Sequence, residues 1–527
     1  MRKLNRFLLL LAALGASAFL TQGCAPPVKT WAEYSKELEA QGEVLDYRQS
    51  IPAPIPSEKN FAHSPLLKPL FDYEWNTELT EAKHRAPAEL DRIQELLKID
   101  LEDSPEIIRW PSGQPVDLSA WQKSFRKKAA LPKPGKTDKI FKELLEKNGV
   151  STDDKPELPR TWPQPAEPGK PAEDVLQALG VFAEDLTELT RAARERPLCR
   201  FDIKYEATLF ATVPHLLVLR HFSECYALRA VARLADGDRE GAFSDTEMVF
   251  FLADCLAGEP MLLSQLVRKS VLEMALQPAW EGLAGRKWTA EQLAKLEKHL
   301  GGIDLLASCR RSLLSERDQL NQYLETLFKL QDSGKEAPQI FGDLKDKPHW
   351  FLDRNKVRIN EIYMKFSRHL IDSETRTINL EVAAEQTRYL EENKLKIDHL
   401  IASIAAMGLK PVARGFGDGQ SIVDLARIAC LLELHKLEEG SYPEKLAGLD
   451  GQLPTDPYSG KAYIYSTLPE AEKTGGYQLY GIGSNLKDDG GRIVLTESGW
   501  VEDEEGDIVW RYSPPPTLLK IPKPGEN

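Results

Sequence analysis

The sequence predicts a mainly α-helical protein, a multi-helix hairpin array that is followed by a small C-terminal α+β module. Over most of residues 173–410, apolar residues recur every three or four positions, which places them on one face of a helix. Beyond about residue 440 this pattern stops, and short aromatic runs alternate with turns rich in Gly, Asn and Asp. We therefore expect a long helical region and a short region of strands after it.

The helical region divides into segments of ordinary helix length. A capping box, Thr289 with Gln292 three residues later, marks the start of one of them. No fixed repeat period appears, so the array fits no particular class of solenoid. The expected helices cover residues 174–196, 206–235, 245–257, 259–284, 289–300, 302–331, 349–372, 376–407 and 421–439.

Residues 61–172 form a mixed segment, in which short helical patches alternate with Pro-rich breaks. We expect helices at 89–101 and 136–147. The proline-rich stretch 158–171 is either a linker or a segment that wraps over the body. No sustained period runs through this part of the chain.

Residues 1–24 have the pattern of an export signal, with positive charges in the first six residues and an apolar run over 7–20. The run is followed by Gly23 and Cys24, and this ending resembles a bacterial lipoprotein signal. The resemblance implies that Cys24 becomes the acylated N-terminus. Thr21 stands where such signals usually carry Leu, so simple secretion and an uncleaved anchor remain alternatives.

The lipoprotein resemblance also implies a location. Ala25, directly after the cysteine, suits an outer-membrane lipoprotein that faces the periplasm of a bacterium with two membranes. Residues 25–60 are polar and contain several prolines, which indicates a tether that lifts the body off the membrane. Residues 513–527 form a tail. The expected partners are the membrane, through the lipid anchor, and other envelope proteins.

The charge balance argues against nucleic acid as a partner. The chain carries 68 Lys and Arg against 81 Asp and Glu, a net charge of −13. No long block of Lys or Arg compensates for this, and phosphate backbones bind basic surfaces. We expect no nucleic-acid binding.

The cysteines beyond Cys24 are widely and irregularly spaced, without a CxxC pair, so no zinc pattern is present. Most fall in apolar helical stretches and are expected to be small buried hydrophobic residues. One or two disulfides are the alternative in an exported protein. These cysteines are Cys199, Cys225, Cys255, Cys309 and Cys430.

Residues 411–512 form the α+β module. Its helix ends at Gly440, because glycine closes helices readily, and Pro443 prevents the helix from resuming. An Asp456-Pro457 turn follows. This string, over about residues 421–512, resembles the globular part of major type II secretion pseudopilins. Here the module follows some 400 other residues, so filament assembly of the pseudopilin kind is not expected.

The chain as a whole resembles uncharacterised exported lipoproteins of planctomycete and verrucomicrobial bacteria, through the same C-terminal string and the segment 257–268. No function comes with that resemblance. The likeness to pseudopilins implies a calcium-binding loop near the end of the module. Asp488, Asp489 and Asp507 would supply its oxygen ligands, with Asn485 where the family usually has Asp. The alternative is a solvated acidic turn.

A second acidic string has the spacing of an EF-hand calcium loop, with a glycine at the sixth position and oxygen-bearing residues at the ligand positions. It lies between two expected helices. The alternative is an ordinary turn of a helical hairpin. The candidate ligands are Asp236, Asp238, Glu240, Ser244 and Glu247.

Catalytic motifs are not found: the sequence has no HExxH, no GxSxG and no P-loop. We therefore favour a non-enzymatic envelope lipoprotein, a helical scaffold or interaction protein that calcium stabilises. The alternatives are an envelope hydrolase with an acidic cleft between helices, and an accessory component near a type II secretion system. Deletion of residues 421–527 is expected to leave the helical body folded.

Overall fold

Helices make up most of the described chain, with a few small sheets, as the hydrophobic periodicity predicts. The computed structural model describes residues 29–99, 101, 104–130, 162–334, 347–394, 396–406, 408–468, 476–495, 501–512 and 519–520. The predicted signal with Cys24, and the helix expected at 136–147, lie outside these residues.

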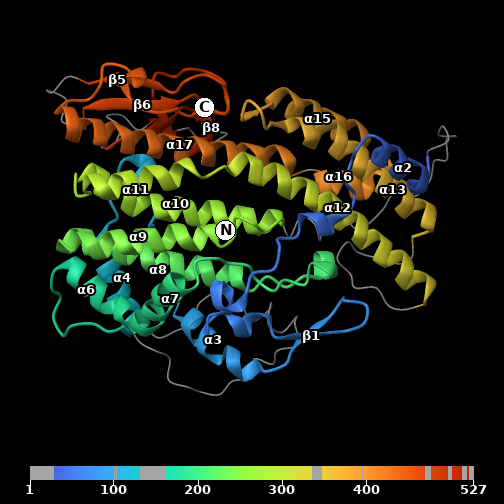
Figure 1. Ribbon diagram of the computed structural model, residues 1–527, viewed down its shortest axis with the longest axis horizontal. Coiled ribbons are helices and arrows are strands. Elements are labelled where there is room, and N and C mark those ends of the chain that lie inside the picture. Colours follow the sequence, from blue (N-terminus) through green and yellow to red (C-terminus); the bar gives the residue numbers. More distant parts are fainter. Residues whose placement is uncertain are drawn as a thin grey trace.

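The centre of the molecule is a stack of long helices that lie roughly side by side (Figure 1). A hairpin of α8 and α9 packs against α10, and α11 and α10 pack against α17. Their bounds are α8 His215–Asp236, α9 Arg239–Asp254, α10 Leu262–Ala284, α11 Ala290–Gly301 and α17 Leu409–Glu439.

A second group of helices lies at one end of the long axis (Figure 1). The long helix α12 runs from the stack to this end, where α13 packs against α12, α16 and α2, and α15 contacts α16 and α17. Their bounds are α2 Trp31–Ala40, α12 Leu305–Asp332, α13 His349–Ile362, α15 Leu380–Asn393 and α16 Leu400–Ala406. A π-helical turn, Tyr363–Ser367, continues α13 into the short α14, Arg368–Leu370.

The smaller elements lie around these two groups. The other helices are α3 Asp91–Lys98, α4 Leu118–Ala130, α6 Pro171–Leu179 and α7 Ala183–Glu195. Short 3-10 turns include η1 Tyr47–Ser50, η6 Trp110–Ser112 and η8 Tyr205–Phe210. Two small hairpins are β1 Tyr73–Trp75 with β2 Ala82–His84, and β3 Ile371–Asp372 with β4 Thr377–Ile378.

Two three-stranded sheets complete the C-terminal region. The first is antiparallel in the order β5-β6-β9, and it packs on α17. The second has the order β10-β7-β8. The strands are β5 Ile464–Thr467, β6 Tyr477–Gly481, β7 Ile493–Leu495, β8 Val501–Gly506, β9 Ile508–Trp510 and β10 Leu519–Lys520.

Two helix ends lie where the capping residues of the sequence predict them. The Thr289 hydroxyl accepts from the Gln292 backbone N–H, and the Gln292 side chain accepts from the Thr289 N–H, which confirms the capping box. At the end of α17, Gly440 has φ 81°, a left-handed conformation that glycine adopts without steric cost.

One helix begins much earlier than expected. α17 starts at Leu409 and runs through Gly415, Gly417 and Gly419. These glycines lie in the gap that we expect between the helices at 376–407 and 421–439. Gly417 serves close packing instead: a Cβ there would lie 2.2 Å from Ile378 Cδ1 and 2.8 Å from the Tyr458 hydroxyl. A periodicity analysis cannot distinguish a glycine that ends a helix from one that lets a neighbour approach it.

The core is continuous across the expected domain boundaries. One cluster of buried apolar residues extends from Tyr47 to Trp510. Trp110 of η6 lies against Trp510 of β9 with ring centroids 5.5 Å apart, and the Trp280 indole N–H of α10 donates to the Arg511 carbonyl at 2.7 Å. The 61–172 segment, the helical stack and the α+β module therefore share one interior.

Residues 29–60 differ from the extended tether that we expect for 25–60. They contain α2 and η1, and both Leu38 and Tyr47 are buried. The Trp31 backbone N–H donates to the Asp353 carboxylate of α13 at 3.1 Å. The prolines that indicate a tether therefore lie in a segment that packs along the body.

The five cysteines of the described chain are free thiols. Cys225, Cys255, Cys309 and Cys430 are buried, and Cys199 is half-buried. Burial raises the pKa of the thiols of the four buried cysteines. They pack as small hydrophobic side chains, the first of the two expected roles.

A buried carboxyl on α17 is expected to make stability fall as the pH rises. Burial raises the pKa of Asp424 to about 6, although Gln420 and Tyr463 donate hydrogen bonds to it. This value exceeds the pKa of an aspartate in the unfolded chain, so folding favours the protonated carboxyl. The resulting stabilisation is complete below about pH 4 and is lost as the pH rises through 6. Asp424→Asn should therefore stabilise the fold by about 1–3 kcal/mol at pH 8, and by about half as much at pH 5. Urea unfolding at both pH values measures this difference, and an equal effect at both would contradict it.

Candidate functional site

The EF-hand-like string forms a tight connection between two helices. Asp236 is the last residue of α8, and α9 begins at Arg239. Asp238 caps α9, because its carboxylate accepts from the Gly241 N–H at 2.9 Å. The remaining candidate ligands, Glu240, Ser244 and Glu247, lie within α9. The string has the hairpin geometry that is our alternative interpretation, and its side chains do not surround a common point.

The residue that fixes this hairpin was not among our candidates. Asp245, buried in α9, accepts from Arg229 at 2.6 and 2.8 Å and from Arg233 at 2.9 Å. A buried carboxylate is stable when it is paired in this way. Its position, three residues after the buried Ala242 and three before the buried Met248, is the only signal that the sequence carries.

The loop near the end of the module brings its three aspartates close together. The Asp507 carboxylate is buried and accepts from the backbone N–H of Gly491 at 2.7 Å and of Asp489 at 3.3 Å. Asp489 accepts from the Asn485 amide at 2.8 Å. Burial, and further the charges of Asp489 and Asp488, raise the pKa of Asp507. The loop therefore holds negative charges that repel one another.

Within the described residues, no group of three or more His, Cys, Asp or Glu side chains is arranged so that it could hold a metal ion. In the same part of the chain, no helix combines the length and the apolar character that crossing a membrane requires. Cys24, the expected lipidation site, is not among the described residues.

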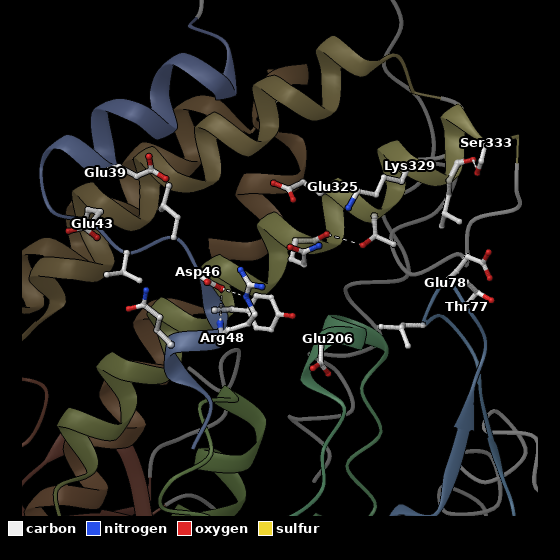
Figure 2. A pocket seen from close by; sticks show the side chains of 18 residues that line it. Glu39, Glu43, Asp46, Arg48, Thr77, Glu78, Glu206, Glu325, Lys329 and Ser333 are labelled. Carbon is white, nitrogen blue, oxygen red and sulfur yellow. Dashed lines mark hydrogen bonds and ion pairs between the residues drawn. The ribbon is translucent and has the colours of Figure 1, made fainter. Parts of the chain in front are cut away.

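An open cleft of about 850 Å³ lies between the N-terminal segment, the β1–β2 turn, η8 and the C-terminal half of α12. Figure 2 shows Glu39 and Glu43 at one end of this cleft and Glu78 at the other, with Glu206 and Glu325 between them. Its acidic lining residues are Glu39, Glu43, Asp46, Glu78, Glu206 and Glu325, and its basic ones are Arg48 and Lys329.

Several of these carboxylates have basic partners. Asp46 pairs with Arg48 at 2.8 Å, and Glu325 pairs with the buried Lys356 at 2.5 Å. Glu206 lies 3.4 Å from Lys204, and both side chains are exposed. The acidic residues outnumber the basic ones along the lining, but cations outside it pair with Glu43, Glu206 and Glu325, so the preference of the cleft for positively charged ligands is modest.

One wall of the cleft is attached to α12 by a buried arginine. Arg317 donates to the Val44 carbonyl at 2.8 Å and to Asp318 at 2.8 Å, and it lies 3.3 Å from Glu43. Arg368 contacts the other oxygen of Glu43 at 2.7 Å. Burial raises the pKa of Asp318 to about 6, and the negative charges of Glu43 and Asp46 add to this shift.

One residue with a strained backbone lines the cleft, and a second follows a lining residue closely in the sequence. Leu79, which lines it, has φ 57°, and Thr208 in η8, two residues after Glu206, has φ 50° and ψ −119°. Such conformations cost about 1–3 kcal/mol for residues other than glycine, and they are concentrated at functional sites. The cleft is therefore the strongest candidate for a binding site. Sequence analysis missed it because its residues come from separate segments that only the fold brings together.

Comparison with known proteins adds no relative from which a function could be taken. No family model matches the chain, and no curated protein or solved structure matches it.

Proposed function

We propose that this protein is a non-enzymatic scaffold of the cell envelope, an outer-membrane lipoprotein that is anchored through Cys24 and binds a cationic segment of another envelope protein in its acidic cleft. The observation that carries the proposal is the cleft itself, which is open and whose charged lining residues are mainly carboxylates. An open acidic cleft can hold a basic segment of a partner through complementary charge. The C-terminal module, with α17 against the antiparallel β5-β6-β9 sheet, supports the proposed likeness to pseudopilins and hence a place near a type II secretion system.

The alternative, an envelope hydrolase, has less support. A hydrolase needs an accessible acid and base within reach of a substrate. The histidine–carboxylate pair His215 and Glu259, at 2.8 Å, has side chains that are 0% and 5% exposed. Phe201 stacks on the His215 ring with centroids 4.1 Å apart, so the pair has the environment of a core contact. The pair His63 and Asp202, at 2.9 Å, is 19% and 52% exposed, but neither residue lines the cleft.

Neutralising two carboxylates of the cleft is expected to weaken binding of a cationic peptide. The variant Glu39→Gln/Glu206→Gln removes two exposed charges, and each contributes up to about 1 kcal/mol at low salt. Affinity for fluorescent pentalysine should fall about five- to tenfold, as measured by anisotropy. Binding should also weaken with added salt, since the attraction is electrostatic.

The matched control changes the net charge equally at sites outside the cleft. Glu291 of α11 and Glu391 of α15 have side chains that are 80% and 66% exposed. The variant Glu291→Gln/Glu391→Gln should bind pentalysine as the wild type does. Equal weakening in both double variants would mean that the peptide responds to overall charge, and it would remove the cleft from the proposal.

We also propose that calcium stabilises the loop of Asp488, Asp489 and Asp507. The repulsion among these carboxylates supports a cation there, although binding requires the Asn485 amide to release Asp489. The expected result is a higher unfolding temperature in calcium than in chelator, lost in Asp488→Ala and kept in Asp236→Ala. An unchanged temperature in the wild type would assign the loop to an ordinary acidic turn.

A further inference from the structure

One aromatic side chain is unusually exposed. Trp350, in the first turn of α13, is 49% exposed, and it is the only tryptophan of the described chain among the exposed large hydrophobic residues. The Arg354 guanidinium lies 5.2 Å from the centre of its ring. An indole that is apolar on its face and polar at its N–H is suited to the boundary between water and lipid, where tryptophan is enriched.

The N-terminal end of the described chain lies beside this surface. Lys29 directly precedes the cap of α2, and the first residue of α2, Trp31, donates its backbone N–H to Asp353 of α13. The Lys356 ammonium lies 4.5 Å from the centre of the Trp31 ring. Asp353 is one turn along α13 from Trp350, so α2 begins close to the exposed indole.

The distance from the predicted lipid to this surface is short. Cys24 and Lys29 are five residues apart in the sequence, which extended chain covers in at most about 18 Å. A free tether over residues 25–60 would instead have reached more than about 100 Å. Because residues 29–60 pack on the body, a lipid on Cys24 would hold the α2–α13 end against the bilayer.

We propose that the first turn of α13 docks on the membrane, with Trp350 in the headgroup region and Arg354 at the lipid phosphates. This inference rests on the proposed lipid anchor. The exposed Lys347 flanks the surface, which fits the anionic phosphates, and Lys29 on the other side is paired with Glu37 at 2.6 Å. The acidic cleft, whose walls include Glu39 in the last turn of α2 and Glu43 just beyond it, is then held near the bilayer.

The test measures the depth of Trp350 in vesicles of phosphatidylethanolamine and phosphatidylglycerol that carry the lipidated full chain. The emission difference between wild type and Trp350→Phe reports Trp350 alone. Brominated acyl chains are expected to remove most of that difference. The control is Trp350→Phe/Leu437→Trp: Leu437 is 59% exposed in the last turn of α17, which ends near β6 at the opposite end of the long axis (Figure 1). The emission that Leu437→Trp adds should not be quenched by the brominated acyl chains.

Lipidation of Cys24 and docking of the α13 surface are separate hypotheses, and either can be wrong without the other. Mass spectrometry of the N-terminal peptide reports whether Cys24 carries lipid. If it does not, a chain with a histidine tag before Ala25, bound to nickel-chelating lipids, still brings the N-terminus to the bilayer and tests the surface. The docking proposal is overturned if Trp350 is not quenched in either format, or if the Leu437→Trp reporter is quenched equally. Protection of Trp350 from iodide without vesicles would overturn it too, in favour of a protein partner.

Discussion

Removal of residues 409–527 is expected to abolish cooperative unfolding of the remaining chain. α17 buries seven large apolar side chains, and burial of each contributes about 1.5–3 kcal/mol. Their sum, about 10–21 kcal/mol, is comparable to or larger than the net stability of about 5–15 kcal/mol that is typical of a domain. These residues are Leu409, Val412, Phe416, Val423, Leu425, Ile428 and Leu432.

Circular dichroism during urea unfolding of residues 25–408, against 25–527, measures this effect. A third chain, 25–440, keeps α17 but lacks the strands, and it should retain a weaker transition because α11, α10 and α12 still have their partner. A transition of residues 25–408 close to that of the longer chain would restore the boundary near residue 410 that the sequence indicates. The structure instead leads us to expect that the body depends on α17.

The second large effect is expected at Arg317. Arg317→Met leaves Asp318 without its cation in a buried site, while Glu43 keeps its contact with Arg368, and breaking a buried pair in this way costs about 3–5 kcal/mol. The loss should appear in urea unfolding at pH 8. It should be smaller at pH 5, because the pKa of Asp318 is raised to about 6 and the group is then largely protonated.

Two further variants isolate the cause. Arg317→Met/Asp318→Asn should recover part of the stability that Arg317→Met loses, since it removes the carboxylate that is left unpaired. Arg311→Met, on the exposed side of the same helix, should change stability by less than about 1 kcal/mol. In Arg317→Met, limited proteolysis is expected to begin between residues 40 and 50, because the Val44 carbonyl loses its donor. A loss as large in Arg311→Met would indicate a general effect on α12.

The helical part of the fold could be predicted because its signals are local. Spacing of apolar residues located α8 to α12, and Thr289 and Gly440 marked helix ends through hydrogen bonds and backbone angles within a few residues. The glycines of α17 show where such reasoning stops. Gly417 lacks a side chain because Ile378 and Tyr458 pack against its backbone. Both neighbours are distant in the sequence, so no local pattern reveals them.

The sites were harder to predict than the helices. The string from Asp236 to Glu247 has EF-hand spacing, but a sequence pattern does not show whether a helix begins within it, as α9 does at Arg239. The cleft was not predictable at all, since Glu39, Glu206 and Glu325 come together only through packing of the N-terminal segment on α12. That packing in turn depends on Arg317, whose burial could not be read from a charged residue in a polar stretch.

The contacts of β9 have a consequence for the order in which the chain folds. Trp110 and Trp510, which touch in the finished core, are separated by most of the polypeptide. Closing a loop of that length is slow compared with forming helical hairpins, so the α8–α9 hairpin should form long before the core is complete. During synthesis, the contact between Trp110 and Trp510 can close only after the last strands have left the ribosome. The part of the core around η6 is therefore expected to be the last to become protected from solvent.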